Sequence, residues 1–253
     1  MMANERLRMA IVAAGLSIED LARRVEVDPK TVERWISKER IPHRRHRWSA
    51  GQVLGSEETY LWPTIEESAV RSASEAELVK LYPHRGAVPQ TLWTSLIDGV
   101  GRNLDILVYA GLFLFDSNPD LGRTIAEKGR SGVRSRLMFG EPASKVLMDR
   151  GNEEGIGEGL IARVRTSLRY LGSVQEEPGV DVRLHDTILY NSLYRFDDDL
   201  LVNVHVHGAP APHNPVIHLR RVPGGRLFRH YLDSFDRIWE HAKPYTPTSP
   251  VKF

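Results

Sequence analysis

The chain has 253 residues, of which 41% are hydrophobic and 26% are charged. This length and composition indicate a soluble globular protein with room for two domains. No run approaches the roughly 20 apolar residues of a membrane span, so we expect no membrane contact. The absence of cysteine excludes disulfides, thiolate metal sites and cysteine nucleophiles, and it fits a cytoplasmic protein.

The positive charge is concentrated near the N-terminus. Residues 1–50 contain eleven Lys and Arg against seven Asp and Glu, a balance of +4, whereas the net charge of the whole chain is +1. The remaining residues therefore carry a balance of −3. An asymmetry of this kind is typical of a nucleic-acid-binding module followed by a domain of another kind.

Residues 1–62 predict a small domain built only of helices. Apolar residues recur there at helical spacing, and Ser17, Asp28 and Pro29 stand where helices begin. The predicted helices are 6–14, 18–25, one that begins at 29 and ends before 42, and 45–54.

Polar residues 63–74 begin with a proline and are predicted to be a linker. Residues 75–245 then predict an α/β domain, followed by a tail at 246–253. The helices of this α/β domain are expected at 87–102, 121–128, 156–171 and 227–242. Its strands are expected at 104–109, 133–139, 180–185, 187–196, 200–207 and 216–222. The predicted fold class is therefore multidomain α+β, with a small all-α domain followed by a mixed α/β sandwich.

Residues 17–42 contain the elements of a helix-turn-helix. The two helices of this motif meet closely, which requires a small residue such as Ala22 in the first helix. Val27 supplies an apolar residue in the turn, and Val32 and Trp35 supply the face that seats the second helix. The N-terminal part of that second helix reads base edges in the major groove.

Residues 5–55 resemble the lambda-repressor/Cro-like (XRE) regulators. The resemblance is carried by Gly15-Leu16-Ser17, Leu21-Ala22, Val27, Lys30-Thr31-Val32, Arg34-Trp35 and Arg40-Ile41-Pro42. Lys38 departs from the family, because many members carry glycine at that position. The resemblance implies that double-stranded DNA is a partner.

The same resemblance implies which side chains contact DNA. Lys30, Thr31 and Arg34 would face base edges or flanking phosphates, since Arg grips guanine with two hydrogen bonds. The basic residues that follow are interpreted as clamps on the DNA backbone. They are Arg40, His43, Arg44, Arg45 and Arg47.

The element order of residues 75–243 loosely resembles one half of a phospholipase-D-like fold. That family carries His-x-Lys-x(4)-Asp on a hairpin strand, where the histidine attacks phosphorus and the lysine holds the phosphate. Counting back from Asp198 or Asp197 places Asn191 and Leu193, or Tyr190 and Ser192, at the two positions. Neither register keeps the motif, so the resemblance implies a domain that has lost this chemistry.

Polar side chains on the last strands still suggest a ligand site. Period-two alternation places Tyr190, Ser192 and Tyr194 on one face of a strand, and Asn203, His205 and His207 on one face of the next. His218 lies on the strand after that. If these faces coincide, they form a site for a small anion or a nucleotide-like ligand.

His205 and His207 also have the spacing of two metal ligands on a strand, with His218 as a third. We favour ordinary hydrogen bonds or a solvated sheet edge, so no metal and no cofactor are expected. Residues 197–199, three aspartates, are interpreted as a solvated hairpin turn. Residues 155–159 are interpreted as a loop, because no strand precedes their glycines as a dinucleotide site requires.

These features predict a sequence-specific transcriptional regulator that is not an enzyme. It would act as a homodimer and respond to a small-molecule effector in its second domain. The competing hypothesis is a DNA-targeted phosphodiesterase or nuclease that uses His185, His205, His207 or His218. A third hypothesis, a component of toxin–antitoxin or phage-defence systems, is left open by the sequence.

Overall fold

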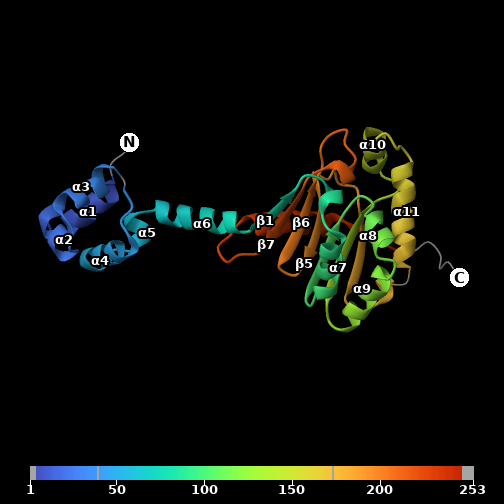
Figure 1. The fold of residues 1–253 in the computed structure, drawn as a ribbon, viewed down its shortest axis with the longest axis horizontal. Helices are drawn as coiled ribbons and strands as arrows, with labels where there is room; N and C mark the ends of the chain where they lie inside the picture. Colours follow the sequence, from blue (N-terminus) through green and yellow to red (C-terminus); the bar gives the residue numbers. More distant parts are fainter. Residues whose placement is uncertain (1–3, 39, 173, 247–253) are drawn as a thin grey trace. The chain divides into compact units, whose positions relative to one another are not determined.

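The computed structural model describes residues 4–38, 40–172 and 174–246 (Figure 1). It divides into two compact units, residues 1–73 and 74–253. The predicted tail, residues 246–253, lies outside the described residues except for its first residue.

The first unit is made of short helices. Backbone N–H groups at their starts are capped by side chains: Asn4 accepts from Leu7 N, Ser17 and Asp20 form a reciprocal capping box, and Asp28 accepts from Lys30 N. The helices are α1 (Glu5–Ala13), α2 (Ile18–Arg24), α3 (Pro29–Ser37), α4 (Arg44–Leu54) and α5 (Glu58–Leu61).

The core of this unit fixes α3 against α2. Leu21, Ala22 and Val32 are fully buried, and Trp35 is 2% exposed. The Trp35 ring meets Trp62 edge to face at 6.2 Å between centroids. One face of α3 is therefore held in the core, so its opposite face points to solvent.

The predicted linker is largely helical. Residues 64–74 form most of α6 (Thr64–Ala76), and β1 (Leu78–Tyr82) follows at once. Pro63 stands just before the helix, where proline costs no hydrogen bond. The polar composition of these residues reflects an exposed helix rather than an unstructured segment.

The second unit is built on an eight-stranded mixed sheet with the order β1-β7-β6-β5-β2-β3-β4-β8. β2 runs parallel to β3 and antiparallel to β5, so strand direction changes at β2. The remaining strands are β2 (Asn103–Leu107), β3 (Arg134–Gly140), β4 (Val180–His185), β5 (Asn191–Phe196), β6 (Asp199–Val204), β7 (Val216–Arg220) and β8 (Lys243–Pro244).

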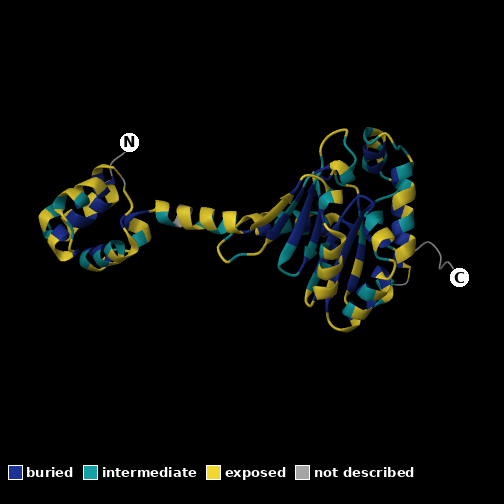
Figure 2. Ribbon diagram, in the orientation of Figure 1, coloured by how far each residue is buried: buried dark blue, intermediate teal, exposed yellow. Residues whose placement is uncertain are grey.

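Helices cover both faces of this sheet, and its central strands are buried (Figures 1 and 2). Trp93 of α7 packs edge to face on Tyr194 of β5, whereas Arg136 of β3 stacks on Phe235 of α12 across the opposite face. The helices are α7 (Gln90–Gly99), α8 (Leu112–Ser117), α9 (Leu121–Arg130), α10 (Lys145–Glu153), α11 (Gly159–Leu171) and α12 (Leu227–His241), with 3₁₀ turns η1 (Arg85–Ala87), η2 (Val174–Glu176) and η3 (Ala211–His213).

The predicted elements of this unit have the right order, but some are missing or too long. β1, α8 and α10 were not predicted, and the strand predicted at 187–196 begins only at Asn191. The strand predicted at 200–207 ends at Val204, one residue after its pairing with β7 ends at Asn203. Every helix among the described residues is too short or too polar to cross a bilayer.

The turn between β5 and β6 is not simply solvated as predicted. The Asp197 carboxylate accepts hydrogen bonds from the backbone N–H groups of Gly101, Arg102 and Asn103, at 2.7–2.9 Å. Burial alone would raise its pKa, but these donors and the Arg102 charge lower the pKa below its usual value. The turn thus fastens the β5–β6 hairpin to the start of β2.

Candidate functional site

The solvent-facing side of α3 carries the residues predicted to contact DNA. Lys30 and Arg34 are exposed and Thr31 is half-buried, whereas Val32 and Trp35 belong to the core. Neither Lys30 nor Arg34 forms an ion pair with another described residue. Their charges are therefore open to an anionic partner.

The basic residues after α3 divide into two groups. Arg40, His43 and Arg44 are exposed, and Arg45 is exposed with an ion pair to Glu26 at 2.8 Å. Arg47 differs, because its side chain is 19% exposed, pairs with Glu58 at 3.0 Å and donates to Pro42 O. Its interpretation as a backbone clamp is not supported, since these contacts hold α4 against α5 and the preceding loop.

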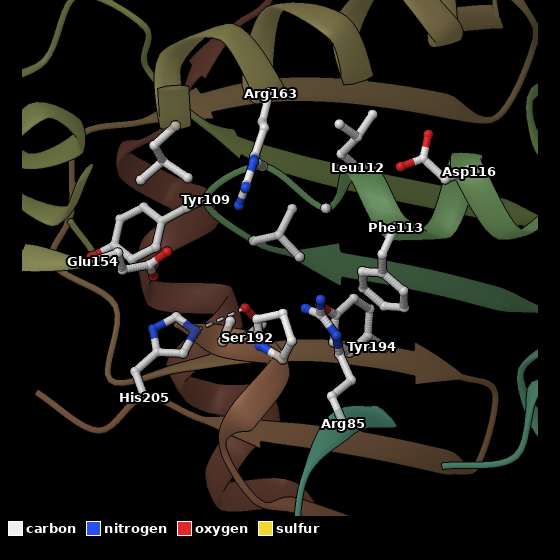
Figure 3. A pocket seen from close by; sticks show the side chains of 16 residues that line it. Arg85, Tyr109, Leu112, Phe113, Asp116, Glu154, Arg163, Ser192, Tyr194 and His205 are labelled. Carbon is white, nitrogen blue, oxygen red and sulfur yellow. Dashed lines mark hydrogen bonds between the residues drawn. The ribbon is translucent and has the colours of Figure 1, made fainter. Parts of the chain in front are cut away.

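A cavity of about 330 Å³ lies in the second unit at the carboxyl end of β2 (Figure 3). The chain leaves β2 through Val108 and Tyr109 and turns at Gly111, which has φ +65°. A side chain at Gly111 would be strained there, and its Cβ would lie 2.8 Å from Val108. β5, η1, η3, α8 and α11 supply the other walls, together with Glu154 after α10 and His205 after β6.

Ser192 and His205 meet at this cavity. The Ser192 Oγ lies 3.1 Å from His205 Nε2, and His205 Nδ1 lies 3.1 Å from the carbonyl oxygen of Leu189. Because a carbonyl only accepts, Nδ1 carries the proton and Nε2 accepts from the Ser192 hydroxyl. The Tyr109 ring stacks on His205 at 5.6 Å and holds the imidazole plane.

His205 is held neutral in this environment. Burial lowers its pKa to about 4, and the positive charges of Arg150 and Arg85 contribute in the same direction, against the bond to Leu189. The imidazole is consequently an acceptor at neutral pH, and its Nε2 is already occupied by Ser192.

The structure brings only part of the predicted ligand set to the cavity. Ser192, Tyr194 and His205 line it. Asn203 shares a face with Ser192 but is fully buried, and His218 is buried with its Nε2 2.7 Å from Asp199. Tyr190 is 80% exposed, and the His207 side chain is 93% exposed because β6 has ended before it.

The remaining histidines have structural partners or face solvent. His185 is buried with Nε2 3.0 Å from Val108 O, and burial lowers its pKa. His207 Nδ1 lies 3.2 Å from Glu153. Within residues 4–38, 40–172 and 174–246, no three or more His, Asp or Glu side chains are grouped to hold a metal ion.

Sequence reasoning missed the charged residues of the cavity. Arg85 comes from η1 and Arg163 from α11, and both guanidinium groups point into the cavity (Figure 3). Asp116 of α8 and Glu154 also line it. Nothing in the local sequence marks these residues, because they stand in polar, helix-forming segments and meet only through the fold.

The neutral state of His205 predicts a specific pH dependence. The folded ring binds a proton only near pH 4, whereas the unfolded chain binds it near 6.5, so acidification between these values favours unfolding. At 1.36 kcal/mol per pH unit, stability should fall by about 2–3 kcal/mol from this group between pH 7 and pH 4. An NMR titration of the His205 ring should show a midpoint near 4.

His205→Asn should remove this part of the pH dependence, while His230→Asn, on an exposed helix face, should leave it in place. A His205 midpoint near its ordinary value would contradict the buried, hydrogen-bonded ring.

The solved structure of TrmBL2, described as an archaeal chromatin protein with a novel mode of DNA binding, is similar over 87% of this chain and 72% of that chain. The identity is 15% and the TM-score is 0.42, so the likeness establishes neither a shared fold nor a shared function. No curated protein matches the chain.

The second unit, in contrast, has a defined family. A family model described as a domain of unknown function, DUF5919, matches residues 75–246, which is more than half of the chain. The match covers the whole sheet and all the walls of the cavity. The chain therefore belongs to the DUF5919 family.

Proposed function

We propose that this protein is a sequence-specific DNA-binding transcriptional regulator. The first unit reads DNA through α3, and the second unit pairs two chains and binds a small effector in its cavity without catalysis. The observation that carries the proposal is that α3 is amphipathic. Val32, Trp35 and Ile36 are buried on one face, and Lys30 and Arg34 are exposed on the other.

The contacts of α3 suit insertion into a major groove. Its N-terminus is fixed by Asp28, and its apolar side is packed against α2, so the exposed side chains start from a rigid base. Arg34 and Lys30 are the types that recognise guanine and phosphate. The exposed Arg40, Arg44 and Arg45 follow in sequence and suit phosphate contacts that fix register.

Pairing of two chains is supported by the edge of the sheet. β1 is the terminal strand, and its Leu78 and Leu81, which the register places on one face across a bulge, are 49% and 60% exposed. An uncovered apolar edge strand promotes pairing with another chain. We therefore propose that β1 contributes to a homodimer, which would present two copies of α3 to two half-sites.

DNA recognition is tested by Arg34→Ala, with Arg8→Ala as a charge-matched control on exposed α1. A binding site is first selected from random and genomic fragments, and affinities are then measured over a salt series. Arg34→Ala should weaken binding to the selected site about 5- to 150-fold, the range of 1–3 kcal/mol for a base contact, with a smaller loss on random DNA. Arg8→Ala should change it less than threefold.

Equal, weak binding of the wild type to all fragments would contradict sequence-specific recognition. Equal losses from Arg34→Ala on selected and random DNA would instead assign Arg34 to a phosphate contact.

Dimerisation is tested by Leu81→Glu. A charge on the exposed edge should destabilise strand pairing between chains, so sedimentation should show a dimer for the wild type and a monomer for the variant. Tyr190→Ser, which removes another exposed apolar side chain outside β1, is the control and should remain dimeric. A wild-type monomer at micromolar concentration, or a dimeric Leu81→Glu variant, would contradict the role of β1.

A second candidate function is a phosphodiesterase, and the Ser192–His205 hydrogen bond is the observation that favours it. A serine hydroxyl bonded to an oriented imidazole is the arrangement of a nucleophile and its base. The other three histidines named for this hypothesis are less suitable, because His185 and His218 are buried in other contacts and His207 faces solvent. A base with a pKa near 4 is weak at neutral pH, which favours the regulator.

Hydrolysis of bis(p-nitrophenyl) phosphate, with and without added divalent metals, distinguishes the non-catalytic regulator from the phosphodiesterase. We expect no turnover above the buffer rate, and the same result for Ser192→Ala. Turnover that disappears in both Ser192→Ala and His205→Ala would overturn the non-catalytic proposal and establish the phosphodiesterase.

A further inference from the structure

The cavity at the carboxyl end of β2 contains two arginines without a counter-charge. Arg85 and Arg163 reach it from η1 and α11, and their guanidinium groups both point into the cavity (Figure 3). Among the described residues, neither side chain pairs with a carboxylate. Two uncompensated cations beside a cavity favour an anion between them.

The carboxylates in the cavity wall do not pair with these arginines. The Glu154 side chain is 6% exposed and its carboxylate lies 2.8 Å from Arg150, which also pairs with Glu153. Asp116 lies on α8, is exposed, and contacts neither arginine as an ion pair. Among the described residues, Arg85 and Arg163 are therefore free to pair with a bound anion.

Arg85 is already oriented for recognition. Its guanidinium carbon lies 3.9 Å above the centre of the Phe113 ring. A guanidinium held over a ring keeps N–H groups at its rim, and the Tyr194 side chain is one neighbour of that rim. Arg163 projects from the opposite wall of the cavity (Figure 3).

Apolar side chains form another part of the wall. They include Val108, Leu112, Phe113, Leu160 and Pro212. The volume of about 330 Å³ falls at the small end of ligand sites. A single ring with one charged head group has the size and the polarity that these walls accept.

A second cavity provides a contrast on the opposite face of the sheet. It is lined by five arginines, but Arg136 and Arg195 bind Asp105, and Arg221 and Arg229 lie beside Asp198 and Asp233. Of its arginines, only Arg134 is without such a partner among the described residues. The number of arginines alone therefore does not indicate an anion site. The absence of a carboxylate partner at both Arg85 and Arg163 does indicate one.

We propose that this cavity binds a small aromatic oxyanion, a flat ring carrying one carboxylate or phosphate. Arg85 and Arg163 hold the anionic oxygens, and the apolar wall holds the ring. Ser192 is not counted as a contact of the anion, because its hydroxyl hydrogen goes to His205 and its oxygen can then only accept. The inference rests on the proposed effector role of the second unit and not on DNA binding.

The test is calorimetric titration of the full chain at constant ionic strength with benzoate, phenyl phosphate, phenol and inorganic phosphate. Benzoate or phenyl phosphate should bind at least tenfold more tightly than phenol, which lacks the charge, and inorganic phosphate, which lacks the ring. The tighter of the two identifies the head group. No binding of either, or equal binding of phenol, would overturn the proposal.

Variants locate the site. Arg85→Ala and Arg163→Ala should each weaken binding at least tenfold, and Arg85→Lys should weaken it as well, because lysine lacks the two-pronged edge. Arg165→Ala, on an exposed position of α11, and Arg134→Ala, in the second cavity, should leave affinity unchanged. A loss in Arg134→Ala with none in Arg163→Ala would move the site to the second cavity and overturn the proposal.

Binding of DNA and binding of the aromatic oxyanion can be tested independently of each other. α3 contributes nothing to the cavity walls, so a chain that does not bind DNA can still bind the aromatic oxyanion. Binding of the probe with no effect on affinity for the selected DNA would support the site and contradict its role as an effector site.

Discussion

The change of strand direction at β2 is the constraint on which the second unit depends. β2 pairs with β3 in parallel on one side and with β5 in antiparallel on the other. The chain therefore leaves β2 at the border between the parallel and the antiparallel part of the sheet. In open α/β sheets, ligands bind outside the carboxyl ends of strands at such a point. The cavity forms there because helices that follow the parallel strands on one side face a hairpin on the other.

The hairpin then determines what the cavity contains. The β5–β6 register pairs Ser192 with Asn203, and the next residues after β6 bring His205 back to Ser192. The Leu189 carbonyl fixes the imidazole proton, and burial keeps the ring neutral. The local charge is supplied instead by Arg85 and Arg163, which enter from elements far away in the sequence. His205 is thus neutral, and the two arginines are the groups of the cavity that suit an anion.

Much of this architecture could be predicted from sequence because it depends on local rules. Helical periodicity and the caps at Ser17 and Asp28 predict α2 to within one residue and the first residue of α3, whereas the end of α3 is predicted only to lie before Pro42. Alternation on β5 and β6 predicts that Ser192 and Tyr194 share a face. Alternation fails at His207, since it holds only while the strand continues, and β6 ends at Val204.

What the sequence could not show depends on contacts between distant residues. The helical character of α6 was obscured by its polar residues, and β1 is exposed over most of its length, which gives no alternating pattern. Arg85 and Arg163 are 78 positions apart (163 − 85) and become neighbours of one cavity only after the sheet has formed. Arg47 looked like its basic neighbours, although its partner Glu58 ties it to the core of the first unit.

The most direct test of this account is a crystal structure of the full chain with phenyl phosphate or benzoate bound. The account predicts the anionic oxygens between Arg85 and Arg163, and the ring against Phe113 and Leu112 at the carboxyl end of β2. A ligand bound instead beside Arg134, on the other face of the sheet, or a cavity that stays empty at saturating concentration, would contradict it.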